Sequence, residues 1–223
     1  MRPRKTVVIA IDGPAAAGKG TLGARLAEKY GLAKLDTGLL YRATGVKVLS
    51  QGGDPEDPAV AEAAARSLDP AELANEALRT DEAAQAASKV SAIPGVRAAL
   101  LDFQHDFAKN PPNLAGDAPA NGAILDGRDI GTTVCPDAEV KLFVTASTEV
   151  RAKRRFKELQ ERGLKAIYAR VLEDMKERDA RDSGRSASPL AASDDAYVLD
   201  TSDLDADAAF AAAVEFISSK DLF

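Results

Sequence analysis

Cysteine and histidine are almost absent from this chain of 223 residues, which contains only Cys135 and His105. A single cysteine excludes an internal disulfide framework and fits a reducing compartment. A single histidine argues against a histidine-rich metal site and against a Ser/His/Asp catalytic triad. The chemistry of the chain therefore has to come from other residue types.

The sequence also lacks a long apolar run and an excess of positive charge. Its first apolar stretch, TVVIAID at residues 6–12, is too short for a signal peptide or a membrane span and ends in Asp12. The net charge of −6 argues against nucleic acid as the main partner. We therefore expect no membrane partner and no nucleic-acid partner. We also expect the protein to act in the cytoplasm as a monomer.

Hydrophobic residues make up 45% of the chain, and apolar runs alternate with helix-forming segments. This alternation predicts one α/β domain with a five-stranded parallel sheet between two layers of helices. Ligands of such folds bind at the carboxyl ends of the strands. The predicted strands are 6–12, 33–36, 123–126, 139–146 and 196–200. The predicted helices are 19–30, 37–51, 147–162, 165–181 and 205–219, the segment 55–109 is mostly helical with breaks at Pro58, Pro70 and Pro94, and the predicted loops are 110–122 and 182–195.

The segment GPAAAGKGT follows the first predicted strand and opens the first predicted helix, which is the context of a phosphate-binding loop. Its small residues let backbone N–H groups converge on phosphate oxygens, and Lys19 adds a charge for the β- and γ-phosphates. Thr21 is the candidate hydroxyl near Mg²⁺, although Gly20 separates it from the lysine. A glycine-rich turn that binds nothing is the alternative, and the lysine at this spacing disfavours it. The loop comprises Gly13, Pro14, Ala15, Ala16, Ala17, Gly18, Lys19, Gly20 and Thr21.

A second motif, ILDGRDIG, ends another apolar strand. Asp126 stands where a carboxylate can orient water bound to Mg²⁺. Arg128 and Asp129 follow a glycine, so the backbone can turn sharply and expose both side chains. The alternative is a turn with two surface charges.

Two further segments indicate a function less specifically than these two motifs. In LDTGLLYR, Thr37 is a plausible N-cap, and Arg42 lies about one and a half turns into the helix. Arg42 can point back at a phosphate or be a solvated helix arginine, and both readings stay open. In SKVSAIPGVR, elementary physics assigns no role to Ser88 or Arg97.

The segment KERDARDSGR carries arginines at spacings of three and four, which places Arg178, Arg181 and Arg185 near one face of a helix. Asp179 and Asp182 lie among them and can hold the guanidinium groups in position. Phosphoryl transfer between two nucleotides gathers many anionic oxygens, and a cationic lid can close over them. Alone, this stretch reads as a solvated ion-pair helix, and its co-occurrence with the phosphate-binding loop favours the lid.

Taken in order, these motifs closely resemble those of bacterial cytidylate kinases, which have the nucleoside monophosphate kinase fold. The resemblance implies a P-loop NTPase-type core at residues 1–37 and 94–223, a helical monophosphate-binding lobe at about 38–93 and an arginine-rich lid at about 178–193. It also implies transfer of the γ-phosphoryl group of ATP, with Mg²⁺, to CMP or dCMP in pyrimidine nucleotide metabolism.

The resemblance further implies roles for individual residues. Residues 13–21 would hold the ATP phosphates, and Asp182 would contact the ribose and brace Arg185. Thr37, Arg42, Arg128 and Arg185 would hold the monophosphate, Ser88, Arg97 and Asp129 would read the cytosine edge, Thr21 and Asp126 would serve the metal, and Lys19, Arg128, Arg178 and Arg181 would act on the transferring group by charge.

Two features differ from the family pattern. Many members have a longer lobe with a small antiparallel sheet, whereas here residues 68–80 fill that stretch and read as helix. The loop 110–122 is long. Among rival enzymes, an adenylate kinase would lack the set that reads cytosine, and a shikimate kinase would act on a neutral alcohol, which does not need so many arginines. A nucleotide-gated switch has little use for a cationic lid.

Overall fold

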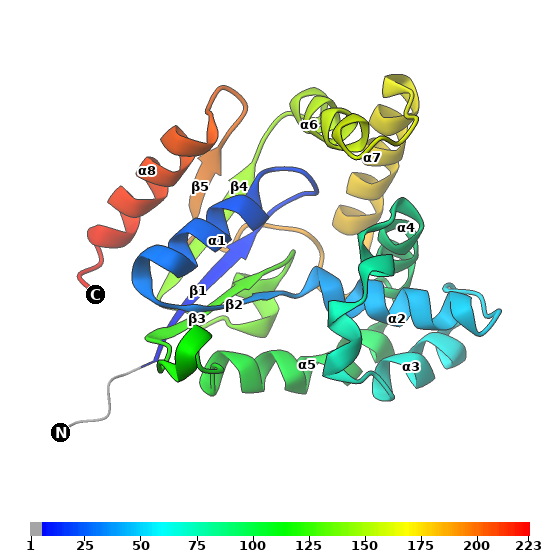
Figure 1. The fold of residues 1–223 in the computed structure, drawn as a ribbon, viewed down its shortest axis with the longest axis horizontal. Coiled ribbons are helices and arrows are strands. Elements are labelled where there is room, and N and C mark those ends of the chain that lie inside the picture. The colour runs from blue at the N-terminus through cyan, green and yellow to red at the C-terminus, as the bar shows by residue number, and fades with distance from the viewer. Residues whose placement is uncertain (1–5) are drawn as a thin grey trace.

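A five-stranded parallel sheet forms the centre of the molecule, in the order β2-β3-β1-β4-β5 (Figure 1). The computed structural model describes residues 6–223. Each predicted strand is present, with ends within one residue of the predicted ones. Because all the strands run in one direction, their carboxyl ends meet at one edge. The strands are β1 (Val7–Asp12), β2 (Ala33–Asp36), β3 (Gly122–Asp126), β4 (Val140–Thr145) and β5 (Tyr197–Asp200).

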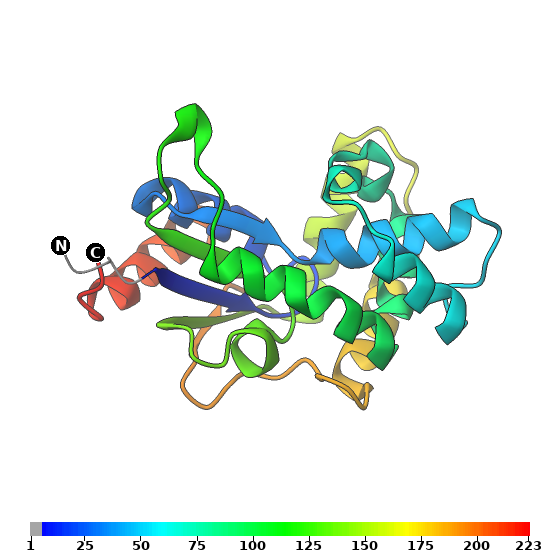
Figure 2. The same ribbon diagram turned by 90° about the horizontal axis from the view of Figure 1, so that it is seen from below.

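Helices cover both faces of the sheet, which confirms the predicted three-layer α/β fold. Helices α1 and α8 pack together on one face, and α5 packs against β3 on the other (Figures 1 and 2). The helices are α1 (Lys19–Tyr30), α2 (Gly38–Ser50), α3 (Pro58–Arg66), α4 (Asp81–Val90), α5 (Pro94–Lys109), α6 (Thr148–Glu161), α7 (Tyr168–Gly184) and α8 (Ala206–Ser218). No helix of the described residues is long and apolar enough to cross a membrane.

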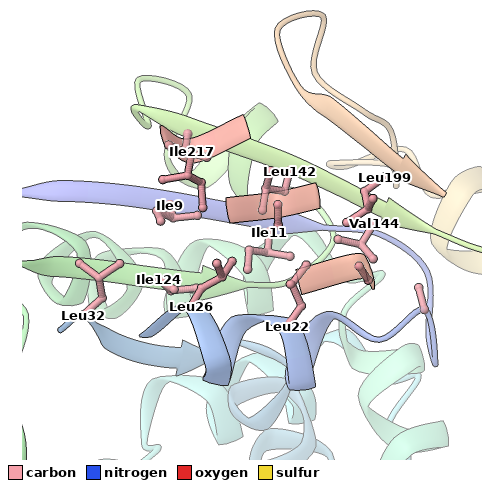
Figure 3. Close-up of a cluster of buried hydrophobic side chains, with 14 of the residues drawn as sticks. Ile9, Ile11, Leu22, Leu26, Leu32, Ile124, Leu142, Val144, Leu199 and Ile217 are labelled. Carbon is pink, nitrogen blue, oxygen red and sulfur yellow. The ribbon is translucent and has the colours of Figure 1, made fainter. Parts of the chain in front are cut away.

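The main core lies between the sheet and the pair α1 and α8 (Figure 3). Ile9 and Ile11 of β1 point into it, while Ala10 points into a separate cluster on the α5 side. Strand β1 is therefore buried on both faces, and this explains why its sequence is continuously apolar instead of alternating.

The segment 68–80 differs from its prediction, since it forms two 3₁₀-helices instead of one α-helix: η1 (Pro70–Ala74) and η2 (Glu76–Arg79). Asp69 and Asn75 each accept a hydrogen bond from a backbone N–H two residues later, so each starts a new turn. Such local side-chain bonds compete with a continuous helix.

The lobe contains α2, α3, α4, η1 and η2, and it lies beyond the carboxyl ends of the strands (Figure 1). Its core includes Leu40, Val48 and Val90, together with Val96 of α5. Helix α5 runs from this lobe to the face of the sheet (Figure 2) and so belongs to both.

Candidate active site

The phosphate-binding loop connects β1 to α1, and side chains from elsewhere hold its carbonyl groups. Arg151 Nη1 donates to the carbonyl of Ala15 at 3.3 Å, and Thr201 Oγ1 donates to the carbonyl of Ala17 at 3.1 Å. Because the C=O and N–H of a trans peptide point in opposite directions, the N–H groups of Ala16 and Gly18 point away from Arg151 and Thr201. Free N–H groups at a helix N-terminus are suited to bind phosphate oxygens.

The backbone of this loop is tightly constrained. Gly13 has a φ of 144°, and a Cβ there would lie 1.9 Å from the carbonyl oxygen of Val144. Ala16 has a φ of 58°, which costs a residue with a side chain about 1–2 kcal/mol. Strain of this kind gathers at ligand-binding segments, where the surrounding structure maintains it.

Lys19 begins α1, where the sequence predicted the start of this helix, and it is buried. Its Nζ donates to the carbonyl of Pro14 at 2.9 Å. Burial, together with the nearby Arg128, lowers the pKa of Lys19 to about 7. A phosphate anion would offset both effects.

Asp12, which sequence reasoning did not assign, links β1 to the segment after Asp129. Its two carboxylate oxygens accept hydrogen bonds from the N–H groups of Ile130 and Gly131, each at 2.7 Å. Burial raises the pKa of Asp12 to about 6. The position of Asp12 at a strand end was visible in the sequence, but its partners were not.

Thr37 ties β2 to β3 in a way that corrects one prediction. It precedes α2 as expected, but its side chain does not cap the helix. Instead, Thr37 Oγ1 donates to the carbonyl of Asp126 at 2.9 Å. This bond fixes the hydroxyl in position, and Thr37 lines the cavity described next.

A cavity of about 50 Å³, termed here the cation cavity, lies between α2, α4, the DGRD segment (residues 126–129) and the end of α7. It brings together all eight residues that the resemblance assigned to the acceptor nucleotide, together with Arg178. Its lining includes Thr37, Arg42, Ser88, Arg97, Arg128, Asp129, Arg178, Asp182 and Arg185.

Two guanidinium groups at this cavity have buried nitrogens without a hydrogen-bond partner among the described residues. They are Arg178 Nε and Arg185 Nη2. Burial lowers the pKa of Arg178 to about 10, and Arg128 beside it acts in the same direction. Buried donors without partners are costly, so this arrangement calls for an anion.

The carboxylates of α7 contact other arginines than predicted. Asp182 accepts a hydrogen bond from Arg128 Nε at 2.9 Å, while Arg185 Nε donates to the carbonyl of Ser188, so Asp182 acts on Arg185 through its charge and not through a hydrogen bond. Asp179 pairs with Arg151 of α6 instead of a lid arginine. The helix continues to Gly184, beyond its predicted end, so these side chains project from a rigid element.

The three residues assigned to cytosine are buried together. Arg97 forms an ion pair with Asp129, and its Nη1 donates to the carbonyl of Ser91 at 3.1 Å. The Arg97 guanidinium also lies 5.3 Å from the ring centroid of Tyr41. Ser88 accepts a hydrogen bond from Arg181. The site therefore places a donor, the Arg97 guanidinium, beside an acceptor, the Asp129 carboxylate, as the polar edge of a flat ligand requires.

Arg42 is not a freely solvated helix arginine. Its Nη1 donates to the carbonyl of Leu78 at 2.8 Å, and its side chain lines the cation cavity. It also lines a larger cavity of about 550 Å³ that runs between the phosphate-binding loop, α4, α6 and α7. Arg155 lines this second cavity and pairs with Asp81 of α4.

A third cavity, of about 250 Å³, opens beside the phosphate-binding loop and has mostly apolar walls, including Leu22, Val144 and Leu204. Arg154 lines it and donates to the carbonyl of Thr201. Sequence reasoning missed the arginines of α6, because RAKRR in a charged helix looks the same as a solvated face.

Oxygen donors suited to Mg²⁺ lie at the carboxyl ends of β2 and β3. Asp36 and Asp126 are neighbours in the sheet register, and Lys34 Nζ lies 3.9 Å from Asp126 Oδ2. Burial raises the pKa of Asp126, and Lys19 opposes that shift. Thr21 is exposed in the first turn of α1. Residues 6–223 hold no group of three or more His, Cys, Asp or Glu side chains arranged as a metal cage.

Comparisons with known proteins show the family to which the chain belongs. The cytidylate kinase family model matches residues 9–219. Cytidylate kinases of Paramagnetospirillum magneticum and Rhodospirillum rubrum are 65% and 58% identical to the chain, each over 96% of it and over 99% and 98% of their own lengths. A crystal structure of an uncharacterized protein from Eubacterium ventriosum shares the fold, with a TM-score of 0.54 and 13% identity over 96% of this chain and 99% of that one. The chain belongs to the cytidylate kinase family.

Proposed function

We propose that the protein transfers the γ-phosphoryl group of ATP to CMP and dCMP, giving CDP or dCDP and ADP. The observation that carries this proposal is the pair of buried, unpartnered guanidinium nitrogens of Arg178 and Arg185 at the cation cavity. A phosphate-binding loop alone accommodates one nucleotide. A second set of buried cations beside it is suited to a second phosphorylated substrate.

The donor side uses the phosphate-binding loop. Residues 13–21 hold the ATP phosphates through their backbone N–H groups, and Lys19 contributes its charge. The third cavity, with its apolar walls and Arg154, accommodates the adenine ring. A flat aromatic ring suits apolar walls with a guanidinium beside it.

The acceptor side uses the cation cavity. Arg128, Arg185, Arg42 and Thr37 hold the monophosphate, and Asp182 contacts the ribose. Residues 38–93 act as the lobe that receives the monophosphate, and residues 178–193 act as the lid. The position of these segments on either side of the cavity supports this division.

Cytosine recognition follows from hydrogen-bond polarity. Cytosine O2 and N3 are acceptors and suit Arg97 and the Ser88 hydroxyl, while its exocyclic amine is a donor and suits Asp129. Uracil reverses the polarity at position 4, so Asp129 would face a carbonyl. Such a mispairing costs on the order of 1–3 kcal/mol or more.

Thr21 and Asp126 would hold Mg²⁺ directly or through water, with Asp36 beside them. The ion supplies positive charge that neutralises the phosphate oxygens when it is bound.

Phosphoryl transfer here requires alignment and charge more than proton transfer. The acceptor phosphate oxygen is already anionic, so a general base is not needed. Lys19, Arg128 and Arg178 stabilise the charge of the transferring group from fixed positions, and the buried cleft excludes water that would compete as acceptor. Arg181, assigned above to the same task, is considered separately below.

A coupled ADP-release assay over CMP, dCMP, UMP, AMP and shikimate tests the function. We expect turnover with CMP and dCMP at kcat/KM values at least tenfold above those for UMP, AMP and shikimate, as expected for a site built to hydrogen-bond its substrate. Preference for AMP would indicate an adenylate kinase, and preference for shikimate would indicate a shikimate kinase. Nucleotide hydrolysis without an acceptor would indicate a switch.

We also propose that the enzyme acts as a monomer in the cytoplasm, in keeping with its one cysteine. Size-exclusion chromatography with light scattering measures the first, and fractionation of the source cells measures the second.

A further inference from the structure

Arg181 differs from the other two lid arginines in what it contacts. Arg178 and Arg185 line the cation cavity and carry buried nitrogens without partners. Arg181 lines neither this cavity nor the larger one next to it. Its side chain reaches α4 instead.

The Arg181 guanidinium makes two hydrogen bonds to α4. Nε donates to Ser88 Oγ at 3.1 Å, and Nη2 donates to Gln85 Oε1 at 2.8 Å. Nη1 lies 4.0 Å from Glu177 Oε2 on its own helix. Gln85 and Ser88 are three residues apart, so they share the face of α4 that meets α7. Two of the three guanidinium nitrogens of Arg181 therefore donate hydrogen bonds to α4, and the third lies near a carboxylate.

The bond to Ser88 determines what that serine can offer. A hydroxyl has one proton to donate and lone pairs to accept. Arg181 Nε occupies one of the two lone pairs of the buried Ser88 Oγ, so the hydroxyl proton points away from this guanidinium group and is available to a ligand. A serine held as a donor suits the acceptor atoms of the cytosine edge.

We propose that Arg181 is a positioning residue that determines base specificity: it holds Ser88 as a donor and joins the cytosine-reading lobe to the lid, and it does not act on the transferring phosphoryl group. This inference rests on the proposed function, because Ser88 reads a base only if the acceptor is a nucleotide.

The test compares Arg181→Met with Arg178→Met, the same substitution one turn earlier on α7. For Arg181→Met we expect the KM for CMP to rise about tenfold, as for loss of a charge-assisted hydrogen bond, while kcat changes by less than about threefold. The ratio of kcat/KM for CMP to that for UMP falls. For Arg178→Met we expect the larger effect on kcat, which should fall about a hundredfold or more, and the smaller effect on the KM for CMP.

Gln85→Leu provides a second route, because it removes the other α4 partner of Arg181 and leaves every lid arginine in place. We expect a smaller change of the same kind, about threefold in the KM for CMP. If thermal unfolding shows that Arg181→Met does not fold, Gln85→Leu decides the question alone. A fall in kcat that exceeds the rise in KM, or an unchanged CMP-to-UMP ratio, overturns the proposal. If the unmodified protein fails to phosphorylate CMP, the proposed function itself is wrong.

Discussion

At the scale of single residues, Lys19 is a buried amine, and nearby carboxylates compensate its positive charge only in part. Burial and Arg128 lower its pKa, Asp126 and Asp36 oppose them, and the resulting pKa is about 7. The folded protein therefore binds fewer protons than the unfolded chain between about pH 7 and the ordinary lysine pKa of 10.5. Between these pH values, Lys19 therefore makes the free energy of unfolding rise as pH increases.

This leads to a prediction about ATP binding. At pH 8 Lys19 is mostly uncharged in the nucleotide-free protein, and the polyphosphate should restore its proton. Titration calorimetry in buffers of different ionisation enthalpy should therefore show proton uptake on ATP binding, approaching one proton per site. Lys19→Met should lose this uptake and still bind CMP. The same proton uptake in the Lys19→Met variant would show that the proton does not bind to Lys19.

At the scale of helices and strands, Arg151 connects the phosphate-binding loop to the lid helix. It is buried at the start of α6, donates to the carbonyls of Ala15 and Ala146, and forms a bidentate pair with Asp179 of α7. The loop, α6 and α7 thus share one guanidinium group. Planar, bidentate arginine pairs of this type fix relative orientation more strongly than a lysine would.

We therefore expect Asp179→Asn and Arg151→Met to be coupled. Asp179→Asn leaves a buried cation short of a partner and should lower the free energy of unfolding by about 1–3 kcal/mol. Arg151→Met should raise the KM for ATP, because Ala15 loses its donor. Urea unfolding of both single variants and the double variant measures the coupling, and additive losses would mean that the pair does not act as a unit.

At the scale of the whole molecule, the fold gathers cations from three distant parts of the chain. Lys19 comes from the start of α1, Arg128 from the segment after β3, and Arg178 from α7. Arg128 lowers the pKa of Lys19 and also that of Arg178, so the positive charges of these groups oppose one another. A site built to receive two polyanions therefore costs stability when no nucleotide is bound.

The consequence is a trade-off that can be measured. Arg178→Met removes a buried, repelled cation and should raise the free energy of unfolding of the nucleotide-free protein by roughly 1–3 kcal/mol, while it abolishes most activity. Arg170→Met, an exposed position on the same helix, is the matched control and should change neither quantity. Urea unfolding with and without CMP and ADP gives the values. A destabilised Arg178→Met protein would show that the arginine contributes to the fold itself.

Local signals were sufficient for much of the fold and for part of the site. The run of β1, buried on both faces, and the stop of α1 at Gly31, whose φ is 63°, are visible in the sequence. Lys19 follows from the spacing of its loop. The pairing of Asp182 with Arg128, and that of Asp179 with Arg151, could not be predicted, because each joins residues more than 25 positions apart.

The sequence by itself determined where strands and helices alternate and which glycine-rich loop joins β1 to α1, because these properties depend on short-range pattern and backbone freedom. The tertiary structure alone decided which arginine contacts which carboxylate. Charged side chains look alike along a helix, and only the packing of α4, α6 and α7 around the carboxyl ends of the strands distinguishes a cation that faces a substrate from one that holds a neighbour in place.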